Sequence, residues 1–504
     1  MGRTTREMRL RELLGNAGAL VEGDDLEVTG IAIDSRRVRA GDVFFALAAQ
    51  AGEGARHVAE AVARGARAVV AANDIAVPGT PVVRIDRPRQ VLGEAAARLA
   101  GDPSARFTLV GVTGTNGKTT TTYILEAIWR AAGFRPGVVG TIAYRFGATS
   151  RSASLTTPDA PALQGLFAAM AAAGTTHVAM EVSSHALAQE RVAGARFDAA
   201  VFTNLTRDHL DFHGDLERYY AAKARLFLEC LPGSGKPDPV AIVNVDDPLG
   251  ARLLASLVTR GIAVGTGKQC DVRPLEVEIS LAGTRGVLDV GGTRLPFTSR
   301  LVGAPHVENM LVAAATAWGL GVDREVIAAG LAAVEPPPGR LEQITGPGFT
   351  VMVDYAHTPD ALARALDVLR PLTAGRLIVV FGCGGDRDRG KRPLMGDAAA
   401  RRADLVVLTS DNPRTEDPLA ILVEIEAGIR AAALPRVAAG ASNGRGYVVE
   451  PDRRAAIALG LGMARPGDLV LIAGKGHEDY QIVGTEKRPF DDRQEVRRAI
   501  GDLS

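Results

Sequence analysis

Cysteine, net charge and long apolar runs are all scarce in this chain. Cysteine occurs three times in 504 residues, at Cys230, Cys270 and Cys383, which is too sparse for a disulfide framework or a cysteine-rich zinc site. Lys plus Arg and Asp plus Glu each number 58, so a sequence-wide attraction to nucleic acid or to a membrane surface is excluded. Any anion site must therefore be local.

The apolar segments are all short. None reaches the roughly 18 residues of a membrane span without an Arg, Asp or Gly. The opening residues MGRTTREMRLRELL are charged throughout, and Arg6 stands where a myristoylation signal has Ser or Thr. With so few cysteines, these absences predict a cytoplasmic protein.

The length predicts several domains, because 504 residues is about three times the usual single-domain size. Hydrophobic residues make up 46% and charged residues 23%, a balance typical of a globular chain. The strand and helix pattern resets at GDPSARF, and three consecutive prolines form a stiff connector before GRLEQI. We expect three domains, at 1–101, 102–338 and 339–504.

The order of apolar and helical segments predicts an α/β fold in each domain. Short strands and Ala-rich helices alternate in the first domain, and in the second the strand 107–114 enters a Gly-rich turn and then the amphipathic stretch 119–133. We expect a central P-loop domain with a parallel or mixed sheet, and a C-terminal Rossmann-like, doubly wound domain. The C-terminal strands are predicted at 349–356, 376–383, 404–411 and 468–474.

The segment GVTGTNGKT at 111–119 is the sharpest chemical signal. Glycines let backbone N–H groups face a phosphate, Lys118 adds a charge, and the Thr119 hydroxyl can hold Mg²⁺. Gly111 stands one residue further back than in the usual P-loop spacing. The alternative is an ordinary turn with a solvated lysine, but strand, glycines, Lys and Thr together favour phosphate binding.

Three further polar residues have two interpretations each. Glu181 ends an apolar strand, where it suits a Mg²⁺–nucleotide site or a plain solvated acid. His209 is either a ligand or acid/base group, or a loop histidine that caps a helix. Lys223 lies within YYAAKARLF, and the pattern alone favours a solvated helix residue.

Basic side chains gather in two predicted strand-end loops of the last third. Arg414 ends the Asp-Asn-Pro-Arg segment 411–414, and the loop before it carries four cations. Such runs are usually solvated faces, but two loops at one crevice can clamp a carboxylate bidentately. Glu478 adds an acid that can hold an ammonium, so the pair suits an amino acid. The four cations are Arg387, Arg389, Lys391 and Arg392.

Five motifs together resemble the Mur ligases of peptidoglycan synthesis. They follow one another in the family's order and span nearly the whole chain. The motifs are GTNGKTT at 114–120, EVSSH at 181–185, NLTRDH at 204–209, DYAH at 354–357 and GKGHE at 474–478.

The resemblance implies an ATP-dependent, ADP-forming ligase of an acid and an amino acid. ATP would phosphorylate the D-glutamyl carboxylate of UDP-N-acetylmuramoyl-L-alanyl-D-glutamate, and the incoming amine would attack the acyl phosphate. The 411–414 segment resembles the branch that adds meso-diaminopimelate, since Asn412 and Arg414 can hold the carboxylate that lysine lacks. ATP and Mg²⁺ are the implied cofactors, with a monomer and no nucleic-acid partner expected.

Carried over position by position, the family's catalytic and metal residues fall on Lys118, Thr119, Glu181, His209 and Lys223. Lys118 would contact the transferred phosphate, and Lys223 matches a carbamylated lysine, whose reaction with CO₂ gives an anionic oxygen pair able to hold Mg²⁺. The implied ATP-binding residues are Gly114, Thr115, Asn116, Gly117, Lys118, Thr119, Thr120, Asn309, Arg340 and Asp354.

Two more residue sets follow from the resemblance. The UDP-muramoyl-dipeptide would contact Ser35, within a uridine-site-like Asp-Ser-Arg motif, and Thr156, Thr157, Ser184, Gln189 and Arg191. Diaminopimelate would contact Arg389, Asp411, Asn412, Pro413, Arg414, Gly474 and Glu478.

Four alternatives stay open from the sequence. A lysine-adding Mur ligase and a folyl-polyglutamate synthetase share the chemistry with a different substrate. A P-loop ATPase switch would hydrolyse ATP without an amino acid and gives the Arg389 and Arg414 loops no task. A non-catalytic sugar-nucleotide binding protein would not depend on Lys118.

Overall fold

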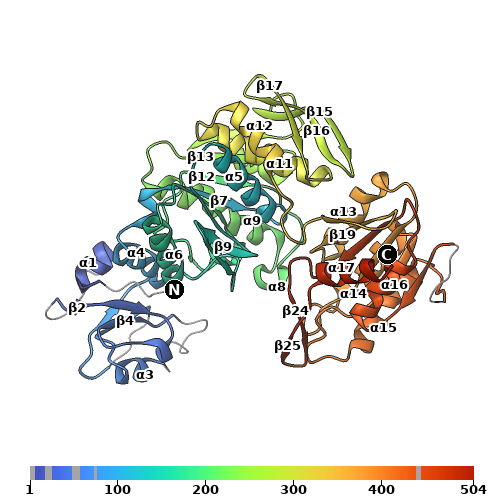
Figure 1. Cartoon of the computed structure of the whole chain (residues 1–504). Helices are drawn as coiled ribbons and strands as arrows, with labels where there is room; N and C mark the ends of the chain where they lie inside the picture. Colours follow the sequence, from blue (N-terminus) through green and yellow to red (C-terminus); the bar gives the residue numbers. More distant parts are fainter. Residues whose placement is uncertain (1–5, 18–24, 48–56, 73–76, 439–443, 504) are drawn as a thin grey trace. The chain divides into compact units, whose positions relative to one another are not determined.

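The computed structural model describes residues 6–17, 25–47, 57–72, 77–438 and 444–503. The chain forms two compact units, drawn with their elements in Figure 1. Unit 1 comprises 1–277, 286–298 and 308–334, and unit 2 comprises 278–285, 299–307 and 335–504. The helices of the described residues are too short or too polar to cross a membrane.

Unit 1 opens with the small α/β domain that the sequence predicts. Its parallel sheet has the order β3-β4-β5-β6. Two apolar clusters, one containing Val43 and Phe45 and the other Phe44 and Val69, cover its two faces. The elements are β1 Met8–Arg9, α1 Leu10–Leu14, β2 Glu27–Val28, β3 Gly30–Ala32, β4 Asp42–Phe45, α3 Val58–Ala63, β5 Ala68–Ala71, β6 Val82–Arg84 and α4 Pro88–Leu99.

A mixed sheet forms the centre of unit 1. Within the described residues it orders eleven strands as β10-β9-β8-β11-β7-β12-β13-β14-β15-β16-β17. The strands from β8 to β14 are parallel, so their carboxyl ends share one edge, where ligands of open α/β sheets gather. The strands are β7 Thr108–Thr113, β8 Pro136–Val139, β9 Ala143–Phe146, β10 Thr149–Ser152, β11 His177–Glu181, β12 Ala199–Phe202, β13 Val240–Asn244, β14 Arg260–Val264, β15 Val272–Ser280, β16 Gly283–Val290 and β17 Thr293–Ser299.

Capped helices follow these strands. Asp159 and Asp215 accept backbone hydrogen bonds at the starts of α6 and α9, which fixes where each helix begins. Helix α12 packs so closely on α5 that a Cβ at Gly330 would lie 2.4 Å from the Cα of Ile128. The helices are α5 Lys118–Ala131, α6 Ala160–Ala172, α7 Ser184–Ala188, α8 Leu210–His213, α9 Leu216–Arg225, α10 Pro248–Ala255, α11 Ala304–Gly319 and α12 Arg324–Ala333.

Unit 2 carries the predicted doubly wound sheet, with order β18-β19-β23-β20-β21-β22 and only the edge strand β18 antiparallel among the described strands. Alternate residues of β23 face opposite clusters: Leu471 packs with α13, α14 and α15, and Ile472 with α16 and α17. The strands are β18 Glu342–Thr345, β19 Thr350–Asp354, β20 Leu377–Phe381, β21 Leu405–Leu408, β22 Gly446–Val449 and β23 Leu469–Ala473.

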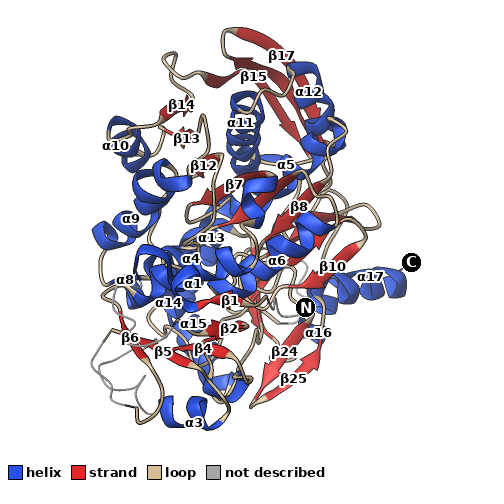
Figure 2. Cartoon of the chain, turned by 90° about the vertical axis from the view of Figure 1, so that its left-hand side faces the viewer, coloured by secondary structure: helices blue, strands red, loops and turns tan. Residues whose placement is uncertain are grey.

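The four C-terminal strands predicted from the sequence correspond to β19, β20, β21 and β23, and β22 was not predicted. A short hairpin of β24 and β25, red in Figure 2, follows β23. These elements are α13 Pro359–Leu369, α14 Lys391–Arg402, α15 Pro418–Ala431, α16 Arg453–Gly462, β24 Tyr480–Val483, β25 Glu486–Pro489 and α17 Asp492–Leu503.

Candidate active site

The Gly-rich loop between β7 and α5 is built around two glycines with positive φ. A Cβ at Gly114 (φ 149°) would lie 1.9 Å from Oγ1 of Thr203, and one at Gly117 (φ 86°) would lie 2.2 Å from Oδ1 of Asn309. Only glycine fits both positions. Asn309, assigned to ATP from sequence, therefore lies directly against the loop.

Lys118 folds back over the loop that precedes it. Its Nζ donates to the carbonyl oxygens of Gly114 and Thr115, at 2.9 Å each. The ammonium is thus placed beside the N-terminus of α5, where backbone N–H groups and the helix dipole favour an anion. The geometry suits a phosphate at this loop.

Thr119 and Glu181 meet behind the loop. The Thr119 hydroxyl donates to Oε1 of Glu181 at 2.9 Å, and Thr141 donates to the same carboxylate from its backbone N–H at 2.8 Å. Glu181 is 1% exposed, so the plain solvated acid is excluded. A hydroxyl and a carboxylate are oxygen donors of the kind that Mg²⁺ takes alongside phosphate oxygens and water, so the residues present fit that ion.

Lys223 is buried, and the pattern-based expectation of a solvated helix lysine is wrong. Helix α9 turns this face inward with Tyr219, and the Nζ of Lys223 donates to the carbonyl of Gly114 at 2.8 Å. Burial, and then the charge of Lys118, lower the pKa of the Lys223 amine well below its usual range. A neutral amine has the lone pair that reaction with CO₂ requires.

His209 stands at the N-cap position of α8 with φ 53°, and its side chain makes no capping hydrogen bond among the described residues. Its ring lies edge-on to His185, 4.8 Å between centroids, and Nε2 is 3.5 Å from Oδ2 of Asp208. Burial lowers the pKa of His209, which favours the neutral ring that binds a metal. In the described parts of the chain, no three His, Cys, Asp or Glu side chains form a ready metal cluster.

The residues matched to the muramoyl dipeptide lie around the carboxyl end of β11. Thr157 donates to the carbonyl of Glu181 at 2.8 Å, and Arg191 donates to the carbonyl of Thr157 at 3.1 Å. Arg191 also holds the Gln189 amide oxygen through two N–H groups. The hydroxyls of Thr156 and Thr141 are hydrogen-bonded to each other at 3.0 Å, and Thr141 in turn donates to Glu181.

Ser184 begins α7, but the capping bond comes from Ser183, which leaves the Ser184 hydroxyl for another partner. That partner is Nε2 of buried His213, 2.9 Å away. The sequence analysis missed His213, although it lies four residues after His209 at the other end of the short α8.

Ser35 lies apart from these groups, in the first domain. Its hydroxyl donates to Oε2 of Glu60 at 2.6 Å, and both residues line a cavity of about 380 Å³ together with Asp34 and His57. The Asp34 side chain accepts from the Arg36 N–H, which holds the Asp-Ser-Arg turn in shape. Glu60 was not identified from the sequence.

In unit 2, Arg340 and Asp354 come together. Asp354 accepts from the N–H of Leu341 at 2.8 Å, and the Arg340 guanidinium lies 4.7 Å from the centre of the Tyr355 ring. Burial raises the pKa of Asp354, opposed by the charge of Arg340. The Nε of Arg340 is buried without a hydrogen-bond partner among the described residues, so a donor is available for a ligand.

Asn412 and Glu478 also lie together, as predicted for the amino-acid pocket. Asn412 donates to Oε2 of Glu478 at 3.0 Å, and the fully buried Lys475 donates to both side chains at 3.1 Å. Lys475 thereby fixes the orientation of both groups. Its role was not visible in sequence, where it is one letter of the GKGHE motif.

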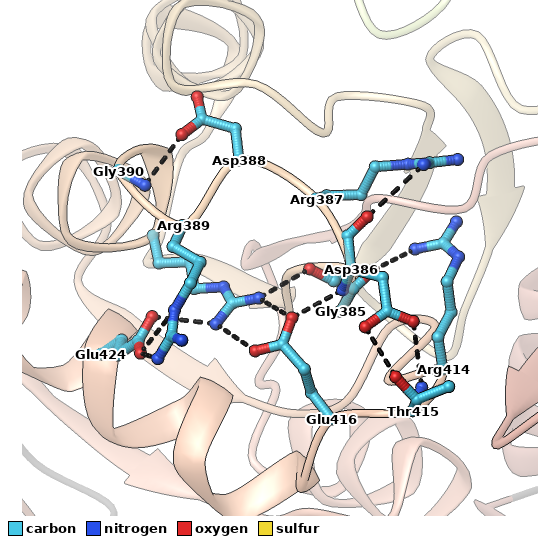
Figure 3. Close-up of polar contacts among 12 residues, drawn as sticks. Gly385, Asp386, Arg387, Asp388, Arg389, Gly390, Arg414, Thr415, Glu416 and Glu424 are labelled. Carbon is cyan, nitrogen blue, oxygen red and sulfur yellow. Dashed lines mark hydrogen bonds and ion pairs between the residues drawn. The ribbon is translucent and has the colours of Figure 1, made fainter.

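The loop after β20 is drawn in Figure 3. Arg414 donates to the carbonyl of Gly385 at 2.6 Å, and a Cβ at Gly384 would lie 2.9 Å from Nη1 of Arg414 and 3.8 Å from Cγ of Arg387. Arg389 instead turns to Glu424, with an Nε to oxygen distance of 3.1 Å. The structure therefore brings Arg387 to Arg414.

Two of the four cations do not belong to that loop, contrary to the expectation from sequence. Lys391 and Arg392 begin α14, and Lys391 donates to the carbonyl of His357. Arg392 is fully buried between Glu416 and Glu424. A buried guanidinium with two carboxylate partners holds the loop together, and both of its Nη atoms are already engaged.

Together these features are those of an α/β enzyme with a Gly-rich, phosphate-type loop in unit 1 and a cluster of polar side chains at the strand-end loops of unit 2. Models of the Mur ligase family, catalytic domain, the Mur ligase middle domain and the Mur ligase, glutamate ligase domain match residues 27–99, 112–317 and 339–476. The chain belongs to the Mur ligase family and has its three-domain α/β fold.

Its relatives match over nearly the full length. Proteins of Geobacter metallireducens and Geobacter sulfurreducens, both described as UDP-N-acetylmuramoyl-L-alanyl-D-glutamate–2,6-diaminopimelate ligase, are 47% and 46% identical. The first alignment covers 95% of each chain, and the second 98% of this chain and 99% of the relative. A solved structure with the same description has 34% identity, a TM-score of 0.72 and 99% coverage of both chains.

Proposed function

We propose that this chain joins meso-diaminopimelate to UDP-N-acetylmuramoyl-L-alanyl-D-glutamate, driven by ATP, in peptidoglycan precursor synthesis. The observation that carries the proposal is the hydrogen bond from Asn412, two residues before Arg414, to Glu478, in the same chain as the Gly-rich loop of Lys118. We take Asn412, Arg414 and Glu478 as an amino-acid pocket. An ATPase switch has no use for such a pocket. The full-length relatives described as diaminopimelate ligases support the same substrate.

The chemistry begins with transfer of the terminal phosphoryl group of ATP to the D-glutamyl carboxylate, which releases ADP. The amine then attacks the acyl carbon, and phosphate leaves as the amide bond forms. A carboxylate becomes an electrophile only when one oxygen is part of a leaving group. The enzyme's main task is positioning and charge neutralisation.

The residues around the Gly-rich loop would bind ATP and Mg²⁺. Lys118 and the loop N–H groups would neutralise the transferred phosphate beside Asn309, which lies against the loop. Thr119 and Glu181 would hold Mg²⁺, and His209 and a carbamylated Lys223 would supply further ligands. Bound Mg²⁺ would neutralise charge on the phosphate oxygens. Arg340 and Asp354 would bind the rest of the nucleotide.

Two other groups of residues would bind the muramoyl dipeptide and diaminopimelate. The muramoyl dipeptide would lie along Thr156, Thr157, Ser184 and Arg191, with the uridine end at Ser35. Glu478 would hold the ammonium of diaminopimelate, because only one of its oxygens is engaged by Asn412 and Lys475. Arg414 would hold a carboxylate of diaminopimelate. In addition to Arg389, we propose Arg387 as a second group for that carboxylate, because Arg387 and Arg414 both lie close to Gly384.

The wider assignments are also part of the proposal. We place domain boundaries near 101 and 338, supported by the ranges of the three family models, and expect a cytoplasmic monomer.

A substrate panel tests the function. Purified protein is given ATP, Mg²⁺, the UDP-muramoyl dipeptide and one amino acid at a time, and the products are identified by mass spectrometry. We expect a product with meso-diaminopimelate that exceeds the product with lysine. Preference for lysine, or ATP hydrolysis without joining, would overturn the proposal. Unchanged turnover in Lys118→Ala would favour a non-catalytic binding protein.

A further inference from the structure

Arg453 is the first residue of α16, and its guanidinium is completely buried. Nε and Nη2 donate to the two carboxylate oxygens of Asp492, at 2.8 and 2.7 Å. Two further donors go to backbone: Nη1 to the carbonyl of Ser410 at 3.2 Å and Nη2 to the carbonyl of Ala473 at 2.9 Å. One guanidinium thus connects three segments far apart in sequence.

The two carbonyls have a particular place in the fold. Ser410 immediately precedes the 411–414 segment, and Ala473 immediately precedes Gly474. These are the two loops that carry Asn412, Arg414 and Glu478. The strands before them, β21 and β23, are not neighbours, because β20 lies between them. The sheet's own hydrogen bonds therefore do not join the two loops directly.

The two loops also lie close together at Gly474 and Asp411. A Cβ at Gly474 would lie 2.6 Å from Oδ2 of Asp411 and 3.8 Å from Nη2 of Arg453. A planar guanidinium with several donors in a fixed geometry can serve two carbonyls and a carboxylate at once, which a lysine ammonium on a flexible stem cannot do with the same geometry. A change at Arg453 should thus alter the distance between the loops.

We propose that Arg453, held by Asp492, is a positioning residue that sets the spacing of the two loops that bind the incoming amino acid. This inference rests on the proposed function, in which these loops form the amino-acid pocket. It predicts that a change at Arg453 alters the Michaelis constant of one substrate of three, whereas a residue needed only for folding would lower the amount of active enzyme without that selectivity.

The chain provides a matched control at the other end of the same sheet. Arg376 donates through Nε and Nη2 to Asp468, at 3.1 and 2.7 Å, and through Nη2 to the carbonyl of Met463 at 2.6 Å. Arg376 and Asp468 precede β20 and β23, so this pair holds the amino ends of the strands, away from the two loops. Both arginines bind an aspartate and a backbone carbonyl, but Arg376 lies at the amino ends of the strands and Arg453 at the carboxyl ends.

The experiment compares Arg453→Lys with Arg376→Lys in the full chain. The Michaelis constants for ATP, the UDP-muramoyl dipeptide and the amino acid are measured, together with the melting temperature. We expect Arg453→Lys to raise the amino-acid KM about tenfold, equivalent to about 1.4 kcal/mol, and to change the other two KM values less than about twofold. Arg376→Lys should lower the melting temperature and leave all three KM values within about twofold.

Equal KM changes in the two variants, or a joint rise of all three KM values in Arg453→Lys, would overturn the inference. If Arg453→Lys does not fold, Asp492→Asn takes its place, since it keeps the shape and weakens the grip on Arg453; the same selective rise is expected. Hydrogen exchange adds a measurement that needs no turnover. Amides of 411–414 and 474–478 should exchange faster in the Arg453 or Asp492 variant but not in Arg376→Lys, and unchanged exchange would contradict the inference.

The wild-type panel separates this inference from the proposed function. If the wild type joins lysine instead of diaminopimelate, the proposed substrate is wrong, and the comparison of variants proceeds with lysine. If the wild type joins diaminopimelate but the variants do not differ, the function stands and the positioning role fails.

Discussion

The hydroxyl of Thr119 donates a hydrogen bond to Oε1 of Glu181 across 2.9 Å, which joins the first turn of α5 to the end of β11. Helix α5 and strand β11 thus bring together two residues that lie 62 positions apart in the sequence. Because the carboxylate is buried and also holds Thr141, its position is fixed before any nucleotide binds. Such preorganisation is what electrostatic stabilisation of phosphoryl transfer requires.

Replacing Glu181 by Gln should lower kcat by about 100-fold or more, because the amide keeps the shape but loses the charge that holds a cation. The measurement is amino-acid-dependent ADP release as a function of Mg²⁺ concentration. Glu126→Gln is the control, since Glu126 is a buried carboxylate on α5, the helix of Thr119, and pairs with Arg130 and Arg145. Similar kinetics in the two variants would remove Glu181 from the metal site.

Lys223→Ala should nearly abolish turnover and recover part of it when short carboxylates are supplied, because they can replace the carbamate oxygens. Lys236→Ala is the control: Lys236 pairs with Asp198 at 2.8 Å, and its loss should not respond to added carboxylate. Turnover is followed by phosphate release at fixed Mg²⁺. Full activity in Lys223→Ala would rule out the carbamate.

Arg414→Ala should raise the KM for diaminopimelate by about tenfold or more, the cost of roughly 1.5–3 kcal/mol for a lost charged hydrogen bond, while the KM for ATP stays nearly constant. Arg387→Ala should act in the same direction. Arg389→Ala should act more weakly, because its guanidinium pairs with Glu424. A larger rise in this KM for Arg389→Ala than for Arg387→Ala would show that Arg389, and not Arg387, contacts the carboxylate.

The stability of unit 1 should fall as the pH drops from about 6.5 to about 4. Burial lowers the pKa of His177 to about 4, so between these values the unfolded chain binds a proton that the folded chain does not. The loss from this residue is at most about 3 kcal/mol, reduced by its partial exposure. His177→Phe should lose less stability than the wild type over this range.

The measurement for His177 is thermal unfolding at several pH values. The ring stacks on Phe134 with 4.0 Å between centroids, so phenylalanine can keep the contact. His57→Phe, at an exposed position, is the control. Parallel pH profiles for wild type and His177→Phe would contradict the assignment.

Gly93→Ala should destabilise the protein by about 1–3 kcal/mol, the usual cost of overpacking. A Cβ at Gly93 would lie 2.4 Å from the carbonyl oxygen of Ala193, so α4 and that backbone would have to separate. Gly462→Ala is the control in another helix, because its Cβ would meet no atom within 4 Å in the described structure; it should be neutral or slightly stabilising. Equal denaturation midpoints would count against this packing.

Local patterns predicted much of this protein. The Gly-rich loop before α5 was visible because strand, glycines, lysine and helix are consecutive in sequence, and the alternation of strands and helices predicted the parallel sheet of unit 2. The rule that ligands gather at the carboxyl ends of parallel strands placed the 411–414 loop and Glu478 at one rim, where Asn412 donates to Glu478. The function implied by the motifs agrees with the family to which the chain belongs.

Tertiary structure alone decided the state of individual side chains. Lys223 is buried because α9 turns it toward the Gly-rich loop, where its Nζ donates to the carbonyl of Gly114. Arg392 is withdrawn from the loop after β20 because Glu416 and Glu424 enclose it. The role of Arg453 depends on three segments that meet only in the folded sheet. Burial and long-range pairing depend on which surfaces come into contact, and a one-dimensional pattern does not contain that information.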